Sequence, residues 1–338
     1  MIRFLENHSL KSHNTFNIEA KAKFYFEFTE VDDLQQLILQ DSLLKENKIL
    51  IVGEGSNILF LNDFDGVIIH SNIPGVRYVK EDRQNVWIEA GAGEIWNEFV
   101  SCCVDLQLGG VENLSLIPGT VGAAPVQNIG AYGQEAANVI ERVKGFDMEK
   151  KEHTEYLNKE CVFGYRDSVF KRSLKNRFII TSVVFKLDKF PVFRLDYGNL
   201  EEEVNQRGGV TLENIKSAID EIRMSKLPDV KELGSAGSFF KNPVVDIKLV
   251  EKIEAKFGKI PVYSASAGKT KIAAGWLVEK CGWKGFREGD AGVHDKQALV
   301  LVNYGKATGK DIFSLSEKIR QSVLDKFGIE LEREVNCI

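Results

Sequence analysis

The stretch that decides how the rest of the chain is interpreted is Ile117–Gly133, with the sequence I-P-G-T-V-G-A-A-P-V-Q-N-I-G-A-Y-G. It contains four glycines, two prolines and three alanines, and it carries no charge. Glycine permits tight turns and close approach, whereas proline fixes φ and removes an N–H donor. We therefore expect a loop whose remaining N–H groups are exposed and surround an anion such as phosphate. The alternative is an ordinary turn in a tight core, but irregular loops of this length are usually functional.

Length and composition limit the class of protein. A chain of 338 residues predicts two or three domains, and 28% charged with 43% hydrophobic residues is typical of globular proteins. The net charge of −5 argues against a nucleic-acid partner. The five cysteines form no C-x-x-C pair and the five histidines have no metal-ligand spacing, so we expect reduced thiols and no metal. The absence of a signal-peptide pattern and of a membrane-spanning run predicts a cytoplasmic protein without a membrane partner.

Hydrophobic periodicity predicts a chain that is rich in strands over its first two-thirds, followed by an α+β unit of about a hundred residues. The expected strands span residues 14–28, 48–52, 57–61, 67–70, 86–90, 139–148, 177–187 and 298–304. The expected helices span residues 31–47, 94–106, 211–226, 246–257, 271–280 and 310–327. Residues 331–335 are compatible with an edge strand.

Two glycine-containing turns follow predicted strands, G-E-G-S-N at 53–57 and G-A-G at 91–93. The Rossmann fingerprint requires a third glycine three residues later, where this chain has Ile58 and Trp96 instead. Both runs therefore fail that test, and a different nucleotide-binding fold remains open. The serine and asparagine that end the first run can both hydrogen-bond a phosphate.

Four polar side chains are candidates for function. Arg166 lies in F-G-Y-R-D-S, where it would form either a surface salt bridge or a bidentate contact with a substrate carboxylate. Ser238 lies in G-S-F-F-K-N-P, which is not a nucleophile elbow, so it is either a capping residue or a positioned proton donor. Glu332 and Glu334 would share one face of a strand, which could simply be solvated.

Seven motifs occur in a recognisable order along the whole chain. They are G-E-G-S-N (53–57), I-P-G-x-V-G-A-x-P-x-Q-N-I-G-A-Y-G (117–133), F-G-Y-R-D-S (163–168), K-L-P (226–228), G-S-F-F-K-N-P (237–243), A-A-G-W-L (273–277) and L-E-x-E-V (331–335). Together they closely resemble the UDP-N-acetylenolpyruvoylglucosamine reductase (MurB) family. A single motif would be weak evidence, but seven in order are a strong signal.

The resemblance implies an α+β fold with the FAD-binding architecture of the vanillyl-alcohol-oxidase/PCMH type. Residues 1–72 and 73–225 would form two FAD-binding subdomains, and residues 226–330 would form a substrate-binding domain. The final strand, 331–338, would return to the first subdomain. Because the chain ends three residues after Val335, we expect that strand to be short.

The resemblance also implies chemistry. NADPH would reduce non-covalently bound FAD, and the reduced flavin would convert UDP-N-acetylglucosamine enolpyruvate into UDP-N-acetylmuramate for peptidoglycan synthesis. Arg166 would hold the substrate carboxylate with Glu334 as its acidic partner, which would stabilise developing charge. Ser238 would protonate the adjacent carbon, and we expect the flanking Phe239 and Phe240 to keep its surroundings poor in water.

Further residues match family positions that contact the ligands. The substrate contacts would be Tyr197, Lys226, Asn242, Tyr263 and Gln297, with Tyr263 on the tyrosine-bearing loop that one version of the family has over the substrate. The FAD contacts would be Gly53, Glu54, Gly55, Ser56, Asn57, Pro118, Gly119, Gly122, Ala123, Gln127, Asn128, Gly130, Ala131 and Tyr132.

We expect a monomer. One alternative is another FAD-linked oxidoreductase of the same fold, which would not explain Arg166, Ser238 and Glu334 together. A second alternative is a non-catalytic nucleotide-sugar-binding protein, and the presence of all three side chains argues against it.

Overall fold

The computed structural model describes residues 2–34, 37, 41–264 and 268–338. Contacts divide the chain into two compact units. The first unit contains Met1–His8, Ala22–Glu54 and Asp65–Ser225, and the second contains Ser9–Lys21, Gly55–Phe64 and Lys226–Ile338. Two short N-terminal stretches therefore belong with the C-terminal third of the chain, while the finer division into three domains stays a prediction.

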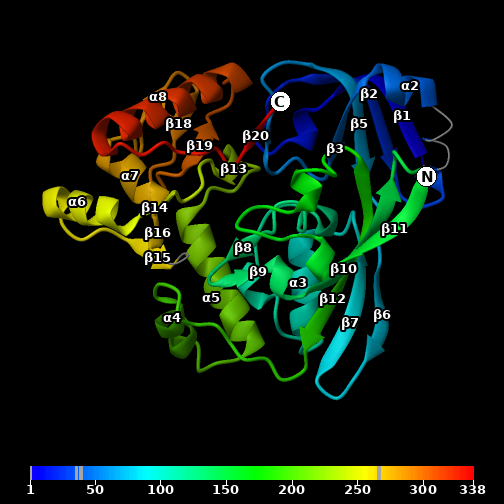
Figure 1. Ribbon diagram of the computed structural model, residues 1–338, viewed down its shortest axis with the longest axis horizontal. Helices are drawn as coiled ribbons and strands as arrows, with labels where there is room; N and C mark the ends of the chain where they lie inside the picture. Colours follow the sequence, from blue (N-terminus) through cyan, green and yellow to red (C-terminus); the bar gives the residue numbers. More distant parts are fainter. Residues whose placement is uncertain (1, 35–36, 38–40, 265–267) are drawn as a thin grey trace. The chain divides into compact units, whose positions relative to one another are not determined.

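The first unit begins with a four-stranded sheet in the order β1-β2-β5-β3, drawn in blue in Figure 1. Its strands are β1 (Ile2–Ser9), β2 (Lys21–Phe28), β3 (Lys48–Val52) and β5 (Phe64–Ser71), and α2 (Asp41–Glu46) precedes β3. β3 and β5 run parallel, and apolar side chains of β2 and β5, including Phe28 and Ile69, form its core.

The predicted strand 14–28 is wrong for its first seven residues. The buried Asn14 side chain bonds the main chain of Leu10 and Ile18, which closes a turn before β2 begins. Of the predicted helix 31–47, residues 33–34 and 37 are helical, as is α2. The rest of its apolar stripe, including Ile38, lies outside the described residues.

A five-stranded antiparallel sheet in the order β11-β10-β12-β7-β6 forms the larger part of the first unit (Figure 1). Its strands are β6 (Val76–Glu81), β7 (Asn85–Gly91), β10 (Ile140–Asp147), β11 (Glu152–Leu157) and β12 (Phe178–Asp188). Helix α3 (Trp96–Asp105) covers one face, where Trp96 and Phe99 pack against Phe185 of β12 at ring distances of 5.8 and 4.6 Å. Alternating residues of the central strands thereby build the main apolar core.

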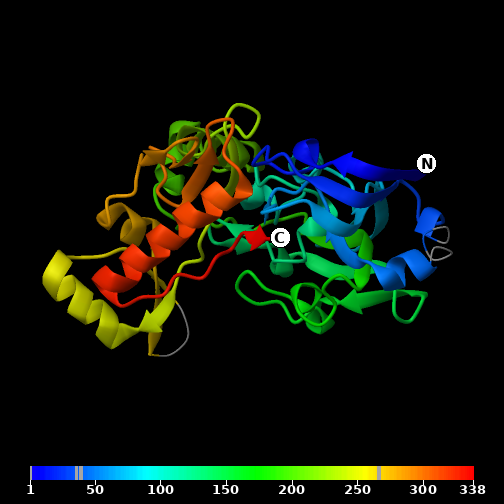
Figure 2. The ribbon, with the colours of Figure 1, turned by 90° about the horizontal axis from the view of Figure 1, so that it is seen from above.

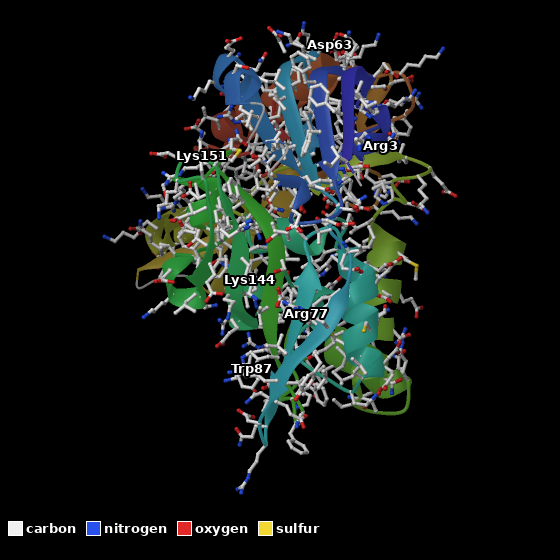
Figure 3. The ribbon with its side chains drawn as sticks, turned by 90° about the vertical axis from the view of Figure 1, so that its right-hand side faces the viewer. Arg3, Asp63, Arg77, Trp87, Lys144 and Lys151 are labelled. Carbon is white, nitrogen blue, oxygen red and sulfur yellow. The ribbon has the colours of Figure 1, made fainter. Side chains whose placement is uncertain are left out.

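The opposite face of this sheet is covered by long charged side chains. Glu89 of β7 is paired with Arg77 of β6 and Lys144 of β10, and Trp87 lies under Lys80 at 4.4 Å (Figure 3). Charged side chains with long apolar stems can cover a sheet in this way without a second layer.

Two helices complete the first unit, α4 (Leu200–Gln206) and α5 (Leu212–Lys226). The spacing of Ile215, Ile219 and Ile222 puts one face of α5 against Leu200 of α4. The predicted helix 211–226 is thus confirmed.

The second unit contains a four-stranded sheet in the order β13-β19-β18-β17 and a three-stranded sheet in the order β14-β16-β15. Its strands are β4 (Ile58–Leu59), β13 (Gly234–Ser238), β14 (Val244–Asp246), β15 (Val262–Ser264), β16 (Lys269–Ile272), β17 (Arg287–Glu288), β18 (Ala291–Val293), β19 (Val300–Asn303) and β20 (Asn336–Cys337). Its helices are α6 (Ile247–Phe257), α7 (Ala274–Lys280) and α8 (Gly309–Phe327). The start of the predicted helix 271–280 is instead the end of β16.

Helix α8 starts at a capping box, in which Thr308 and Asp311 satisfy each other's N–H groups. Figure 2 shows the chain leaving α8 and running back beside it to the C-terminus. There β20 pairs in parallel with β4.

Three further features concern cofactors and location. All five cysteines are free thiols, as predicted. In the described ranges, no cluster of three or more His, Cys, Asp or Glu side chains is arranged to hold a metal ion. The described helices include none that is long and apolar enough to cross a bilayer.

Candidate active site

The loop 117–133 uses most N–H groups of its first half within the protein. The N–H groups of Val121 and Gly122 donate to the oxygens of Glu94 and Ala92 at 2.8 and 2.9 Å. Those of Ala123, Ala124, Val126, Asn128 and Ile129 close turns inside the loop. The expected row of exposed donors is therefore wrong for this part, because the short helical turn at 121–123 folds the loop on itself.

The first two residues of the run 53–57, Gly53 and Glu54, nevertheless lie against the loop 117–133 in the first unit. A Cβ atom at Gly53 would lie 2.7 Å from the hydroxyl oxygen of Thr120, so only glycine allows this approach. The Glu54 carboxylate accepts a hydrogen bond from the N–H of Gly119, and burial raises the pKa of Glu54. The remaining predicted FAD contacts on these runs are Gly55, Ser56, Pro118, Gly122, Ala123, Gln127 and Ala131.

Asn128 fixes the second half of the loop. Its side chain is 1% exposed, and its Nδ2 donates to Glu135 Oε2 at 2.8 Å and to the oxygen of Gly164 at 3.0 Å. Its Oδ1 accepts the N–H of Ala137 at 2.9 Å. Asn128 thus joins the loop to the F-G-Y-R-D-S run, which is a structural task that its amide is well suited to perform.

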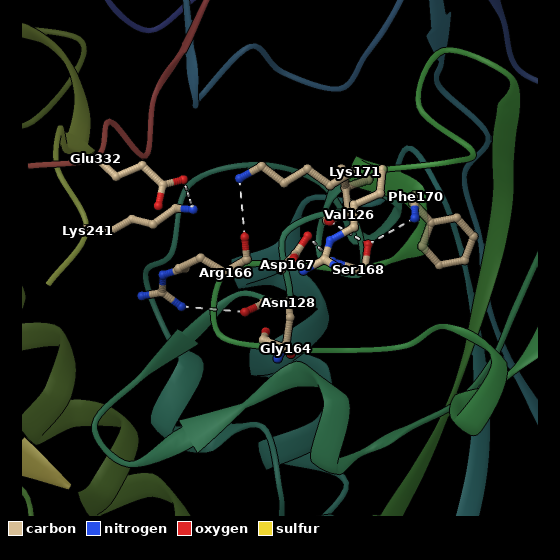
Figure 4. Close-up of polar contacts among 11 residues, drawn as sticks. Val126, Asn128, Gly164, Arg166, Asp167, Ser168, Phe170, Lys171, Lys241 and Glu332 are labelled. Carbon is tan, nitrogen blue, oxygen red and sulfur yellow. Dashed lines mark hydrogen bonds and ion pairs between the residues drawn. The ribbon is translucent and has the colours of Figure 1, made fainter. Parts of the chain in front are cut away.

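Arg166 lies on that run with φ at +55°, a left-handed conformation that is uncommon for arginine. Its Nη2 donates to the oxygen of Gly130 at 2.7 Å and its Nη1 to the oxygen of Asn128 at 3.5 Å, the bond drawn in Figure 4. A Cβ atom at Gly130 would lie 3.0 Å from Nη1, so glycine gives the guanidinium room. Ser168, fully buried, donates to the oxygen of Val126 at 2.6 Å and fixes the run to the loop.

Tyr132 brings a second group of side chains together. Its ring centroid lies 5.6 Å from that of Tyr197, a predicted substrate contact. Its main-chain oxygen accepts a hydrogen bond from Asn113 at 2.8 Å. Burial raises the pKa of Tyr132, and the nearby Arg223 partly offsets that rise.

Arg223 of α5 is a candidate that the sequence analysis missed. Its Nη2 donates to the oxygen of Leu116 at 3.1 Å, whereas its buried Nε has no hydrogen-bond partner among the described residues. Burial lowers the pKa of Arg223, and Tyr132 and Asp220 act against that shift. The signal that could have identified it is its position four residues after Ile219, which places a cation beside the buried stripe of α5.

In the second unit, the chain around Ser238 pairs with the C-terminal segment. Phe240 forms an antiparallel bridge with Arg333. The N–H of Glu334 donates to the oxygen of Phe239, and the N–H of Lys241 to that of Glu332, both at 2.9 Å. Ser238 and Glu334 therefore lie on adjacent extended segments. An ion pair between Lys241 and Glu332 also links these segments (Figure 4).

Asn57 also contacts this segment. Its side-chain Nδ2 donates to the main-chain oxygen of Glu334 at 3.3 Å, and its main-chain oxygen accepts the N–H of Asn336 at 3.1 Å. Its amide, expected to bond a phosphate, thus supports the C-terminal segment. Of the predicted edge strand 331–335, only Arg333 takes part in a bridge, and regular pairing begins at β20.

The water-poor surroundings expected for Ser238 are not formed by its two neighbours. Phe239 and Phe240 are 0% and 1% exposed and belong to the core, whereas Ser238 itself is exposed. The pairing of β13 with β19 is irregular between Ser235 and Ser238, and β13 ends at Ser238, before the two rings.

Two predicted substrate contacts meet at the start of α7. The Oδ1 of Asn242 accepts the N–H of Ala274 at 2.9 Å. The Oε1 of Gln297 lies 3.2 Å from where a Cβ atom of Gly275 would stand. Lys226 is exposed at the end of α5, and Tyr263 lies on β15, where its oxygen accepts the Thr270 hydroxyl at 2.8 Å. Residues 265–267, in the segment that follows Tyr263, lie outside the described residues.

The structure therefore assembles two groups of predicted residues. Arg166, the loop and Tyr197 belong to the first unit, and Asn57, Ser238 and Glu334 belong to the second. A separate cavity of about 480 Å³ in the first unit, lined by Glu112, Asn113 and other residues, contains none of the predicted site residues.

Comparison with known proteins identifies the family. A family model described as FAD binding domain matches residues 22–150, and one described as UDP-N-acetylenolpyruvoylglucosamine reductase, C-terminal domain, matches residues 229–338. Relatives named UDP-N-acetylenolpyruvoylglucosamine reductase from Flavobacterium johnsoniae and Bacteroides fragilis are each 46% identical to this chain. The match to the Flavobacterium johnsoniae relative spans 98% of this chain and 98% of the relative. The match to the Bacteroides fragilis relative spans 98% of this chain and 99% of the relative.

A solved structure supports the fold. The reductase of the same name from Thermus caldophilus aligns with a TM-score of 0.67 and 23% identity over 100% of this chain and 98% of its own. The predicted α+β fold with an FAD-binding domain of the vanillyl-alcohol-oxidase/PCMH type is confirmed. The full-length similarity to curated relatives and the match to the C-terminal domain show that the chain belongs to the UDP-N-acetylenolpyruvoylglucosamine reductase family.

Proposed function

We propose that this protein is an NADPH-dependent flavoenzyme that reduces UDP-N-acetylglucosamine enolpyruvate to UDP-N-acetylmuramate, a precursor of peptidoglycan. The observation that carries the proposal is 46% identity to the curated reductases over nearly the whole chain, with the proposed catalytic side chains present. We also propose that it acts in the cytoplasm as a monomer. A sizing measurement would test the oligomeric state.

The first unit contains groups that suit FAD. The buried Nε of Arg223 calls for an anionic or carbonyl oxygen, because an unsatisfied buried donor is costly. The flavin dinucleotide offers both kinds of acceptor. Gly53, Glu54 and the loop 117–133 would hold it, with Gly53 and Thr120 close together where the two segments meet. When bound, the flavin would supply the redox chemistry, namely hydride transfer between NADPH and the enolpyruvyl group.

Arg166 would act on the substrate carboxylate. Its guanidinium is directed by the oxygens of Asn128 and Gly130, so it is oriented before substrate binds. Addition of hydride to the methylene carbon moves an electron pair toward the carboxylate, and a fixed cation stabilises that charge more in the transition state than in the substrate. Glu334 would be the acidic partner of Arg166 in this step.

Ser238 would complete the reduction. Its hydroxyl donates a proton to the carbon that bears the carboxylate, which converts the carbon–carbon double bond into a single bond and balances the hydride added at the neighbouring carbon. The hydroxyl is exposed at the end of β13, so an incoming ligand can reach it. Bound substrate would have to exclude water there, since a serine is a weak acid when solvated.

The proposal is tested by two measurements on the purified protein. Denaturation should release FAD from a yellow preparation, which also tests non-covalent binding. NADPH oxidation should then depend on UDP-N-acetylglucosamine enolpyruvate and should yield UDP-N-acetylmuramate. A colourless protein that takes up no added FAD would contradict the proposal. Oxygen consumption with simple alcohols, without NADPH oxidation on the enolpyruvyl sugar, would favour a different oxidoreductase of the same fold.

A further inference from the structure

The segment that carries Glu334 is attached to α8 through the neighbouring residue, Arg333. The Arg333 Nε donates to the Ser316 hydroxyl at 3.0 Å, and its guanidinium carbon lies 4.3 Å from the centre of the Phe313 ring. A terminal nitrogen forms an ion pair with Glu317. These three contacts hold a long and flexible side chain, and they leave 18% of it exposed.

The contacts come from one face of α8, because Phe313, Ser316 and Glu317 are three and four residues apart. One turn further along this face is Arg320, whose Nε donates to the oxygen of Leu331 at 2.9 Å and whose Nη1 donates to Glu317 Oε1 at 2.8 Å. Glu317 Oε1 therefore joins two arginines that hold the same segment.

Neighbouring side chains of an extended segment point to opposite sides. With Arg333 held against α8, the carboxylate of Glu334 is directed away from that helix. The main chain adds to this control, since the N–H of Glu334 donates to Phe239 and its oxygen accepts from Asn57. The direction of the Glu334 side chain is thus set by the combination of main-chain bonds and the Arg333 contacts.

A largely buried arginine is a costly way to attach a segment to a helix. Removing a guanidinium from water is unfavourable, and an apolar residue that packs on Phe313 would often hold two elements together at least as well. What arginine adds is direction, because its planar group brings Nε to the Ser316 hydroxyl and a terminal nitrogen beside Glu317 only in one arrangement. The choice of residue therefore points to orientation rather than to stability.

We infer that Arg333 is a positioning residue for Glu334: the Arg333–Ser316–Glu317 contacts fix the orientation of the Glu334 carboxylate for reduction of the enolpyruvyl group. The inference rests on the proposed function for the role of Glu334. The orientation itself can be measured without any turnover.

The test compares Arg333→Met with Arg287→Met. Arg287 is a matched control in the same unit, because it also stacks on an aromatic ring, Tyr304 at 4.0 Å, and pairs with a carboxylate, Asp290. In Arg333→Met we expect enolpyruvyl reduction by the pre-reduced enzyme to slow about ten- to a hundredfold, the scale of a misplaced catalytic group. Flavin reduction by NADPH should stay within twofold of wild type, and Arg287→Met should match wild type in both steps.

The readout independent of activity is the side-chain carboxyl carbon signal of Glu334 in glutamate-labelled protein, assigned by its loss in Glu334→Gln. We expect its chemical shift to change in Arg333→Met and not in Arg287→Met. Glu317→Gln, a milder variant at a half-exposed position, should give the same change and guards against loss of folding in Arg333→Met.

A double variant separates positioning from a general structural role. Adding Arg333→Met to Glu334→Gln should cause no further loss of enolpyruvyl reduction, because Arg333 acts through Glu334. A further loss equal to that of Arg333→Met alone, or an unchanged Glu334 signal in both Arg333→Met and Glu317→Gln, overturns the inference. If wild type fails to reduce the enolpyruvyl sugar, the proposed function is overturned, and the Glu334 signal still decides whether Arg333 orients the carboxylate.

Discussion

The two charged side chains assigned to the substrate carboxylate are held in opposite ways. In the first unit, Arg166 is directed by its own guanidinium, which bonds the main-chain oxygens of Asn128 and Gly130. In the second unit, the orientation of Glu334 depends on hydrogen bonds of its own main chain and on the contacts of the neighbouring Arg333 side chain. The orientation of the Arg166 guanidinium therefore depends on the glycine-rich loop 117–133, and that of the Glu334 carboxylate depends on helix α8.

The comparison shows why the two motifs differ in composition. A loop that offers main-chain oxygens to a guanidinium must let it come close, hence Gly130. A segment that is attached to a helix needs an anchoring side chain next to the functional side chain. In Glu-Arg-Glu at 332–334, Arg333 is the anchor to α8 and Glu334 is the functional residue. Variants that remove one type of support at a time can test this difference.

The largest effect is expected for Ser238→Ala, which removes the proposed proton donor. Loss of a positioned acid should lower turnover with the enolpyruvyl substrate by about 10²–10⁴-fold. Steady-state rates and analysis of the product are the measurement, with Ser225→Ala as a control at an exposed serine outside both groups. A loss below about threefold would remove Ser238 from the mechanism.

Arg166→Lys should come next, with a loss of about 10²-fold in kcat/KM, the scale for removal of one charge-stabilising donor. Lysine keeps the charge but lacks the planar fork that bonds Gly130 and a carboxylate together. The measurement is kcat/KM for the enolpyruvyl sugar, and Arg172→Lys, four residues after the F-G-Y-R-D-S run, is the control. Equal rates in Arg166→Lys and wild type would show that the main-chain contacts do not prepare this arginine for substrate.

Asn128→Ala should affect the loop itself. It removes three hydrogen bonds and leaves buried partners unsatisfied, so we expect a loss of about 2–3 kcal/mol in the free energy of unfolding. Denaturant unfolding gives this quantity, and kcat/KM should fall in parallel because Arg166 loses its fixed support. A variant with normal stability but reduced activity would mean that Asn128 contacts a ligand directly.

The smallest effect is expected for the pH dependence of stability, to which Asp147 contributes. Asp147 is fully buried, and its hydrogen bonds from Arg177, at 3.0 and 2.8 Å, hold its pKa below the usual range, with the N–H groups of Lys150 and Glu149 adding to the effect. A carboxyl group with a lower pKa when folded stabilises the protein above the unfolded pKa, about 4. That contribution is lost as pH falls through the folded pKa.

Asp147→Asn should therefore be less stable than wild type at neutral pH and should lose less stability on acidification. The thermal midpoint measured from pH 7 to pH 3 checks the prediction. Parallel curves for the two proteins would contradict it.

Local patterns predicted much of the fold. The run 48–52 and the helix 310–327 are close to β3 and α8, because β-branched residues and a capped amphipathic pattern decide them locally. Strands β1 and β6 were missed, since their exposed polar faces give little periodic signal. The fold class itself came from the order of the seven motifs.

The sequence indicated which residues form the candidate site, but it did not predict how they are arranged in space. Pairing of Phe239 with Glu334 joins positions almost a hundred residues apart, and no local pattern encodes it. The same limit explains why Asn57 was assigned to phosphate although its amide supports Glu334, and why Ser238 was expected to be shielded by rings that turn into the core.

The most direct test of the account separates the two half-reactions in Glu334→Gln by rapid mixing without oxygen, with the visible absorbance of the flavin as the signal. The account predicts that NADPH bleaches the flavin at the wild-type rate, and that the enolpyruvyl sugar restores its colour at least ~10²-fold more slowly than in wild type. Equal slowing of both steps, or a normal return of colour, would contradict the assignment of Glu334 to the reduction of substrate.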